Sequence, residues 1–184
     1  MYWKAEDGRS DVKELIKDYP AVYGWEIGDL ELGKEINLDG VPFDKMKQYI
    51  KEGHQRGGVI TISWHLANPI TGGNSWDFSN RSIASILPGG EHHAIFEGYM
   101  SKAAEFLADL KDDQGKLIPI IWRPFHEHTG GWFWWGINSS TDEDYKKLFR
   151  YSVDYLRKEK GLHNLIIGYN TGTEFTNSEE YLKR

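Results

Sequence analysis

Apolar and polar residues along this chain follow two alternating patterns, one typical of buried strands and one typical of amphipathic helices. Short apolar runs rich in β-branched residues, bounded by glycine, proline or polar clusters, predict strands at 20–27, 58–66, 116–125 and 164–171. Longer stretches with apolar residues three and four positions apart predict helices at 10–19, 41–57, 91–113 and 142–159, and a further helix starts at 177. Helix and strand therefore alternate along the chain.

Two of these helices carry more detailed signals. Ser10 stands where an N-cap is expected, and Val12, Leu15 and Ile16 are the apolar residues of the helix that follows. The helix predicted at 91–113 has an apolar stripe, which consists of Ile95, Tyr99, Ala103, Phe106, Leu107 and Leu110.

The alternation predicts a parallel sheet with helical crossovers, with strands buried on both faces. Residues capable of chemistry follow the ends of the strands, at 25–26, 64–65, 123–127 and 169–170. In (β/α)₈ barrels and in open α/β sheets, active sites lie at that end of the strands. A closed barrel needs eight strands and about 250 residues. The fold class is therefore α/β, and the 184 residues read as half of a (β/α)₈ barrel in one partial domain, 1–184.

Composition narrows the range of partners. The net charge is −6 and the lysines and arginines are scattered, so nucleic acid and anionic membranes are poor candidates. The chain has no cysteine, and no apolar run approaches the ~20 residues of a membrane span. The first ten residues lack the apolar core of a signal peptide, so we expect none in this chain.

Aromatic residues gather at 120–136, which reads IIWRPFHEHTGGWFWWG and holds four of the eight tryptophans. They surround Arg123 and Glu127, an arrangement that favours a site for an external ligand. A carboxyl group among aromatic rings is desolvated, and desolvation suits a carboxyl group to general-acid catalysis near neutral pH. The structural alternative is that Glu127 simply pairs with Arg123.

The histidines beside Glu127 do not have metal-site spacing. His126 and His128 lack the i, i+4 separation of HExxH, and if the strand continues they lie on the face opposite Glu127. We therefore expect no metal, and we expect His126 to position the carboxyl group or a substrate hydroxyl. No phosphate-binding loop and no G-x-S-x-G motif are present, and we expect no cofactor.

Other candidate ligand contacts lie near the same edge of the sheet. The second predicted strand ends with Trp64, His65 and Asn68. Trp76 lies in the loop that follows, where its indole either stacks on a sugar ring or anchors the loop. Trp132 and Trp135 offer flat faces on which sugar rings stack, although one or two of the clustered tryptophans serve only as core. The combination favours a glycosidase cleft, but glycoside hydrolysis needs a second carboxylate, and no obvious one is present.

The segment RPFHEHTGGWFWWG strongly resembles the motif of glycoside hydrolase family 26, whose best-known members are endo-β-1,4-mannanases. The segments SDVKELIKDYPAVYGWE, ITISWHLANP and NLIIGYNT also resemble successive strand regions of that family. The visible departure is HEHTGG, where the family more often has Met and then Asn or Asp after the glutamate.

This resemblance implies a (β/α)₈ barrel, of which the chain holds strands two to five, and a retaining double displacement on mannan, glucomannan or galactomannan. Glu127 matches the acid/base and His126 the histidine before it, while the family's nucleophile would lie beyond Arg184. His65 and Trp132 match sugar contacts nearest the cleavage point, and Trp76 an outer stacking residue. Arg123, Asn68, Trp64 and Trp135 are further expected contacts. The family usually acts outside the cytoplasm, so an extracellular, periplasmic or cell-surface location is implied.

Several alternatives remain open at this point. The same family includes enzymes for mixed-linkage β-glucan and β-1,3-xylan, and no residue separates these substrates. A non-catalytic glycan-binding protein would keep the aromatic cleft without turnover. Four strands also leave two open sheet edges, which another copy or fragment could cover.

Overall fold

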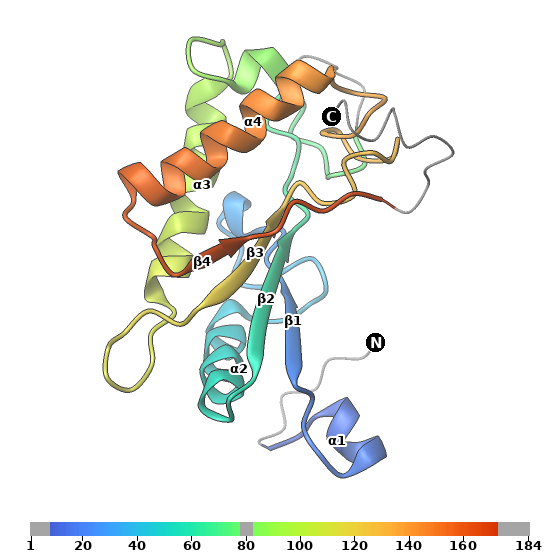
Figure 1. Ribbon diagram of the computed structural model, residues 1–184. Coiled ribbons are helices and arrows are strands. Elements are labelled where there is room, and N and C mark those ends of the chain that lie inside the picture. The colour runs from blue at the N-terminus through green and yellow to red at the C-terminus, as the bar shows by residue number, and fades with distance from the viewer. Residues whose placement is uncertain (1–7, 78–82, 173–184) are drawn as a thin grey trace.

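The computed structural model describes residues 8–77 and 83–172 and shows one four-stranded parallel sheet. Its strands are β1 (Val22–Glu26), β2 (Val59–Trp64), β3 (Ile120–Pro124) and β4 (Leu165–Ile167). They lie side by side in chain order, β1-β2-β3-β4, as Figure 1 shows. In register, Ile60 is opposite Ile120, which in turn is opposite Leu165. The ends of all four strands therefore point in one direction, as the alternating pattern predicts.

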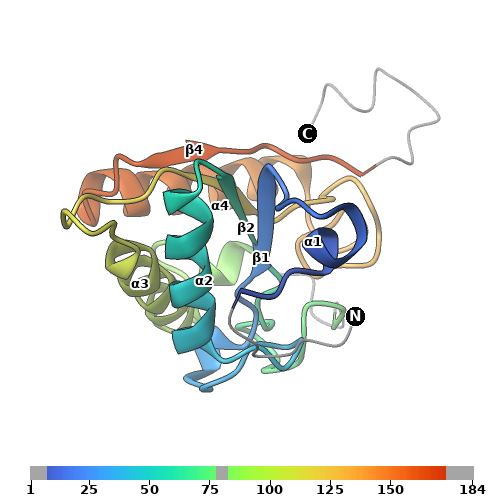
Figure 2. The same cartoon turned by 90° about the horizontal axis from the view of Figure 1, so that it is seen from below.

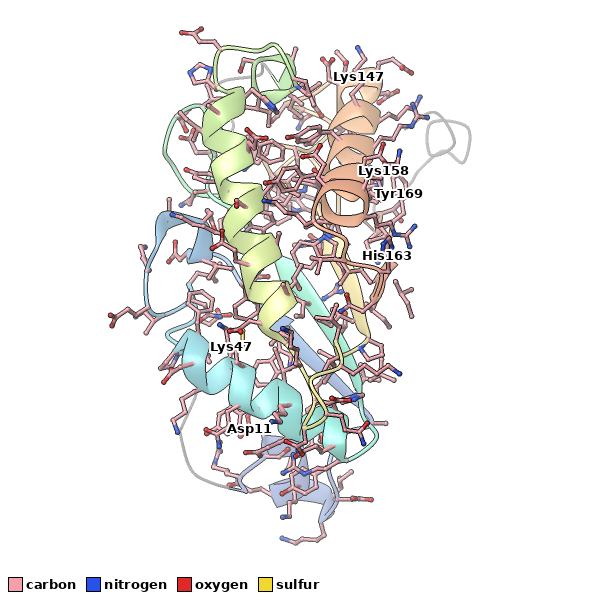
Figure 3. All side chains as sticks on the ribbon, turned by 90° about the vertical axis from the view of Figure 1, so that its left-hand side faces the viewer. Asp11, Lys47, Lys147, Lys158, His163 and Tyr169 are labelled. Atoms are coloured by element: carbon pink, nitrogen blue, oxygen red, sulfur yellow. The ribbon has the colours of Figure 1, made fainter. Side chains whose placement is uncertain are left out.

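Helices connect the strands. The α-helices are α1 (Asp11–Ile16), α2 (Phe43–Gln55), α3 (His93–Asp109) and α4 (Asp142–Asp154), and α4 continues into a π-helical segment, Tyr155–Glu159. Short 3₁₀ helices occur at Leu30–Leu32 and Ile83–Ile86. Figure 2 shows α2 and α3 on one side of β1 and α1 on the other. An ion pair between Lys47 of α2 and Asp109 of α3 joins these two helices on the side shown in Figure 3. No helix in the described ranges is long and apolar enough to cross a membrane.

The two faces of the sheet differ in character. On the helix-covered face, Ile60, Ile62, Trp64, Ile120 and Trp122 are buried in one core with side chains of α2 and α3. The intervening positions form the open face, which consists of Gly24, Glu26, Thr61, Ser63, Ile121 and Arg123.

The prediction that the strands are buried on both faces is wrong for β1, which has no fully buried residue. The reason is that β1 lies at the edge of the described sheet, next to β2, so Tyr23 and Trp25 on one face and Val22 and Gly24 on the other all remain at least partly accessible.

Local details of the helices are partly as predicted. Ser10 caps α1, where its Oγ accepts a hydrogen bond from the backbone N–H of Lys13 at 3.4 Å. However, α1 buries none of its residues, and Leu15 is 83% exposed. The buried stripe of α3 includes Phe96 and Met100, whereas Ile95 is exposed, so the predicted stripe is rotated by one residue at its start.

The last predicted strand is shorter in the structure than in the prediction. The strand predicted at 164–171 is confirmed only over Leu165–Ile167. The helix predicted from 177 lies outside the described residues.

Candidate active site

The chain turns sharply after β3, and this turn places the candidate acid. Phe125 and Glu127 have φ angles of 47° and 55°, in the left-handed region that non-glycine residues seldom adopt. Tyr145 donates its hydroxyl to the carbonyl of Phe125 at 3.1 Å, and the Trp135 indole donates to the carbonyl of His126 at 2.9 Å. These two buried donors fix the carbonyl groups of the turn. The strand therefore ends at Pro124, one residue before the predicted end, and strand alternation does not apply to His126 and His128.

Glu127 projects from this turn into an accessible position. Its carboxyl group is exposed and accepts a hydrogen bond from the indole N–H of Trp132 at 3.0 Å. The predicted desolvation by the tryptophan cluster is therefore absent, because Phe133, Trp134 and Trp135 pack inward and leave only Trp132 beside the carboxyl group. Arg123 does not pair with Glu127; its Nε donates to Thr61 Oγ1 across the open face at 3.0 Å.

His65 links the end of β2 to the turn after β3. Its Nδ1 lies 2.8 Å from Glu26 Oε2, and its Nε2 lies 3.1 Å from Nε2 of His126. Trp76 stacks on the His65 ring, with centroids 5.5 Å apart and planes 15° apart. Phe133 meets the rings of both histidines edge-on, at 5.2 and 5.5 Å. The ends of β1, β2 and β3 are thus connected by side chains.

Glu26, at the end of β1, was not among the ligand contacts expected from the sequence. Its side chain is only 12% exposed. Burial alone would raise the pKa of this carboxyl group, but hydrogen bonds and charge from His65, with help from Ser63, lower it overall. One signal for Glu26 was present in the sequence. Glu26 and His65 end two successive predicted strands, and strand alternation can place both side chains on the same face of the sheet.

The two histidines that flank Glu127 are both buried, and for different purposes. The pKa of His126 is lowered to about 4 by burial and by the neighbouring His65, so this ring is neutral at physiological pH. His128 packs its ring on Tyr145, with centroids 4.3 Å apart, and near Tyr169 at 4.7 Å. Within 8–77 and 83–172, no group of three or more His, Asp or Glu side chains could hold a metal ion.

Three expected ligand contacts do not reach the open face. Trp64 is fully buried on the helix-covered face and donates its indole N–H to Glu31 at 2.9 Å. Trp135 is fully buried beneath the turn. Asn68 is also fully buried, where its amide donates to the carbonyl of Asp77 and its oxygen accepts from the N–H of Ile70. These side chains shape the core and the loops instead.

Other expected contacts remain accessible near Glu127. Trp76 is 50% exposed, while His65, Arg123 and Trp132 are partly exposed. A hollow of about 570 Å³ beside β1 reaches Glu26, Ser63 and Arg123 but is not lined by Glu127 or Trp132. Glu127 and Trp132 therefore lie outside this hollow, whereas Glu26 and Arg123 line it, so the concavity alone does not locate the candidate acid.

Comparison with known proteins gives a consistent result. Residues 4–182 match the family described as Glycosyl hydrolase family 26. A mannan endo-1,4-beta-mannosidase of Bifidobacterium adolescentis is 39% identical over 179 residues, covering 95% of this chain and 18% of that protein. A mannan endo-1,4-beta-mannosidase of Bacillus subtilis is 32% identical over 171 residues, covering 86% of this chain and 46% of that protein.

Solved structures agree with these relatives. A β-mannanase from Bacteroides ovatus matches with a TM-score of 0.94 and 45% identity, over 98% of this chain and 53% of that one. The catalytic domain of an endo-β-1,4-mannanase from Bacillus sp. JAMB-750 matches with a TM-score of 0.86 and 38% identity, over 96% and 46%. The predicted fold class, four βα units of a (β/α)₈ barrel, is confirmed. The chain spans about half the length of these proteins, or less.

Proposed function

Since the chain belongs to glycosyl hydrolase family 26, we propose that residues 1–184 form part of the catalytic domain of an endo-β-1,4-mannanase. Glu127 is the general acid/base of this proposal. Its substrates are β-mannans, including glucomannan and galactomannan. Because such polymers are too large to enter a cell intact, the enzyme acts extracellularly, in the periplasm or at the cell surface.

The position of Glu127 is the observation that supports the proposal. Its carboxyl group stands at the carboxyl end of β3, exposed and held by one N–H, from Trp132. Active sites of (β/α)₈ barrels lie at that end of the strands. An accessible carboxyl group with a single fixed donor can give a proton to a glycosidic oxygen and later take one from water.

The chemistry we propose is a retaining double displacement. A second carboxylate attacks the anomeric carbon while Glu127 protonates the leaving oxygen, so that one C–O bond forms as the other breaks. Water then attacks the glycosyl-enzyme as Glu127 removes its proton, which regenerates both carboxyl groups. We propose that the second carboxylate lies beyond Arg184. Glu26 is unsuited to that role because its carboxyl group accepts hydrogen bonds from Ser63, His65 and Gly28.

Aromatic rings near Glu127 support binding of a sugar polymer. Trp76 is 50% exposed and Trp132 is partly exposed, and both can stack on pyranose faces. Arg123 supplies hydrogen-bond donors on the open face, where it reaches Thr61 of β2. This aromatic surface also supports a second candidate function, a glycan-binding protein without turnover.

The first test is mannan binding and hydrolysis by this chain. In native gels containing soluble galactomannan, the chain is expected to migrate more slowly than in plain gels. Glu127→Gln is expected to keep that retardation, since it preserves Trp76 and Trp132. Glu105→Gln, an exposed glutamate on α3, is the matched control. Absence of retardation would contradict the proposed mannan cleft.

Reducing-sugar release separates the catalytic and binding functions. Without a second carboxylate, the chain alone is expected to release little sugar. Any release should fall by about 10²–10⁴-fold in Glu127→Gln if this residue is the acid/base. Release that Glu127→Gln leaves unchanged would contradict the role of Glu127. Mixed-linkage β-glucan and β-1,3-xylan, run in parallel, test the other substrates of the family.

A further inference from the structure

The carboxyl group of Glu26 accepts four hydrogen bonds, and their arrangement determines the protonation of its neighbours. Oε1 accepts from the backbone N–H of Gly28 at 2.7 Å and of His65 at 2.6 Å. Oε2 accepts from Ser63 Oγ at 2.7 Å and lies 2.8 Å from Nδ1 of His65. Backbone N–H groups can only donate, and an ionised carboxylate can only accept. The His65 nitrogen that faces Glu26 must therefore carry the hydrogen.

We propose that Glu26 is a positioning residue that fixes His65 as its Nδ1–H tautomer and, through His65, orients the ring of His126. In the neutral form of His65, Nε2 is a bare acceptor, so the facing Nε2 of His126 must donate across the 3.1 Å that separates them. The hydrogen bonds then run in one direction, from His126 to His65 to Glu26. The lowered pKa of Glu26 and the pKa of His126 near 4 agree with this distribution of protons.

This chain of hydrogen bonds matters because of where it ends. His126 directly precedes Glu127, and its buried ring lies inside the turn between two residues with left-handed φ angles. His126 is buried, and among the described residues its Nδ1 has no hydrogen-bond partner, so His65 alone holds the ring by a hydrogen bond. Through the two rings, Glu26 thus acts on one of the contacts that hold the turn carrying Glu127, in addition to the hydrogen bonds from Tyr145 and Trp135. This last step rests on the proposed function.

The charged and titratable groups around the two rings are few. Glu26 faces them from β1, and Arg123 and Glu127 face them from β3 and its turn. Of these, Glu26 alone touches His65 directly. A change of charge at Glu26 should therefore be felt first at His65 and then at His126.

Glu26→Gln makes the proposal testable, because the amide cannot reproduce the hydrogen bonds of the carboxylate. The two backbone N–H groups require the amide oxygen at the Oε1 position, which turns the NH₂ toward Ser63 and His65. His65 Nδ1 must then accept, so its proton moves to Nε2. His65 in turn donates to His126, whose own proton moves to Nδ1. Both histidines are expected to exchange tautomers.

The experiment is long-range ¹H–¹⁵N correlation spectroscopy of the chain with ¹⁵N-labelled histidine, at a pH well above the ordinary histidine pKa of about 6.5. Wild type is expected to show His65 protonated on Nδ1 and His126 on Nε2, and Glu26→Gln the reverse for both. Ser63→Ala is the matched control, since it removes a donor to the same oxygen and should leave both tautomers unchanged.

Two results would overturn the proposal. One is a wild-type spectrum with His65 protonated on Nε2, which does not depend on any variant folding. The other is a folded Glu26→Gln variant that keeps the wild-type tautomers. These spectra require no sugar, so their outcome is independent of mannan binding. Failure to bind mannan would count against the proposed function and would leave the assignment of Glu26 standing.

Discussion

Glu31, on the helix-covered side of the sheet, and Glu26, on its open face, are both withdrawn from water, yet their pKa values shift in opposite directions. Burial raises the pKa of Glu31, and the N–H groups of Ala67 and Trp64 only partly offset the effect. At Glu26 burial also acts to raise the pKa, but His65 and Ser63 outweigh it. Their partners Trp64 and His65 are adjacent in the chain and point to opposite faces.

The difference teaches how one strand end can serve two purposes. Glu31 accepts from Trp64 Nε1 at 2.9 Å and from the Ala67 N–H at 2.6 Å, so it ties the 3₁₀ segment Leu30–Leu32 to the loop after β2. That task needs acceptors rather than charge. Glu26 has four donors, one of which is an imidazole that can carry a positive charge. The type of donor, an imidazole at Glu26 and uncharged N–H groups at Glu31, therefore separates the acid that supports structure from the acid that supports the site.

The largest expected effect is loss of the tryptophan on the helix-covered face. Trp64→Ala should lower the free energy of unfolding by about 3–5 kcal/mol, because it leaves a cavity and removes one donor from a buried carboxyl group. Urea denaturation followed by circular dichroism measures this. A loss below about 1 kcal/mol would mean that the helix-covered face is not the stabilising one.

The opposite pKa shifts predict opposite pH dependences. An unfolded glutamate has a pKa of about 4.3. The pKa of Glu31 is raised by folding. Burial of Glu31 therefore does not reduce the free energy of unfolding below about pH 4.3, but it does so increasingly as pH rises through the folded pKa. The lowered pKa of Glu26 means that its stabilisation is present above about 4.3 and is lost as pH falls through the folded pKa.

Substitution by glutamine should reveal these slopes. From about pH 3 to 7, Glu31→Gln should gain stability relative to wild type, whereas Glu26→Gln should lose it, because the amide does not titrate. Urea unfolding at a series of pH values measures both, and any pH-independent cost of the amide cancels in the slope. Parallel slopes for the two variants would remove the distinction between the two acids.

The smallest effect is expected on the open face. Thr61→Val removes the acceptor of Arg123 but keeps the shape of the side chain. Because Arg123 is partly exposed and can turn to water, the free energy of unfolding should change by less than about 1 kcal/mol. The same urea titration measures this. A loss comparable with that of Trp64→Ala would contradict the contrast between the faces.

Much of the fold could be predicted from the sequence, because periodicity reports burial directly. The β-branched runs at β2 and β3 and the alternation of elements were sufficient for a parallel sheet. The apolar residues of α1 were misleading, since they are exposed. Periodicity shows that a helix has an apolar side but does not show whether anything in this chain covers it.

The site was predicted less completely, for a geometric reason. Glu127 and His126 stand out by composition, but the turn that separates their environments has no sequence pattern of its own. Its two left-handed positions hold Phe125 and Glu127, neither of which is glycine. Trp64 looked like a ligand contact because side-chain direction at a strand end depends on a register that the sequence does not state, and Trp135 because nothing in the sequence shows which rings of a loop pack inward. Glu26 was undervalued because its partner His65 lies 39 positions away.

The left-handed backbone on either side of His126 also limits which residues this turn accepts when variants are selected only for folding. Among non-glycine residues, asparagine and aspartate enter that region most readily, while a β-branched side chain is strained there by about 1–3 kcal/mol. In a randomised library sorted only for folding, position 127 should drift toward glycine and asparagine. Enrichment of glutamate there, once the library is placed in a longer chain that carries the second carboxylate and is sorted on growth with mannan, would distinguish what the backbone tolerates from what the chemistry demands.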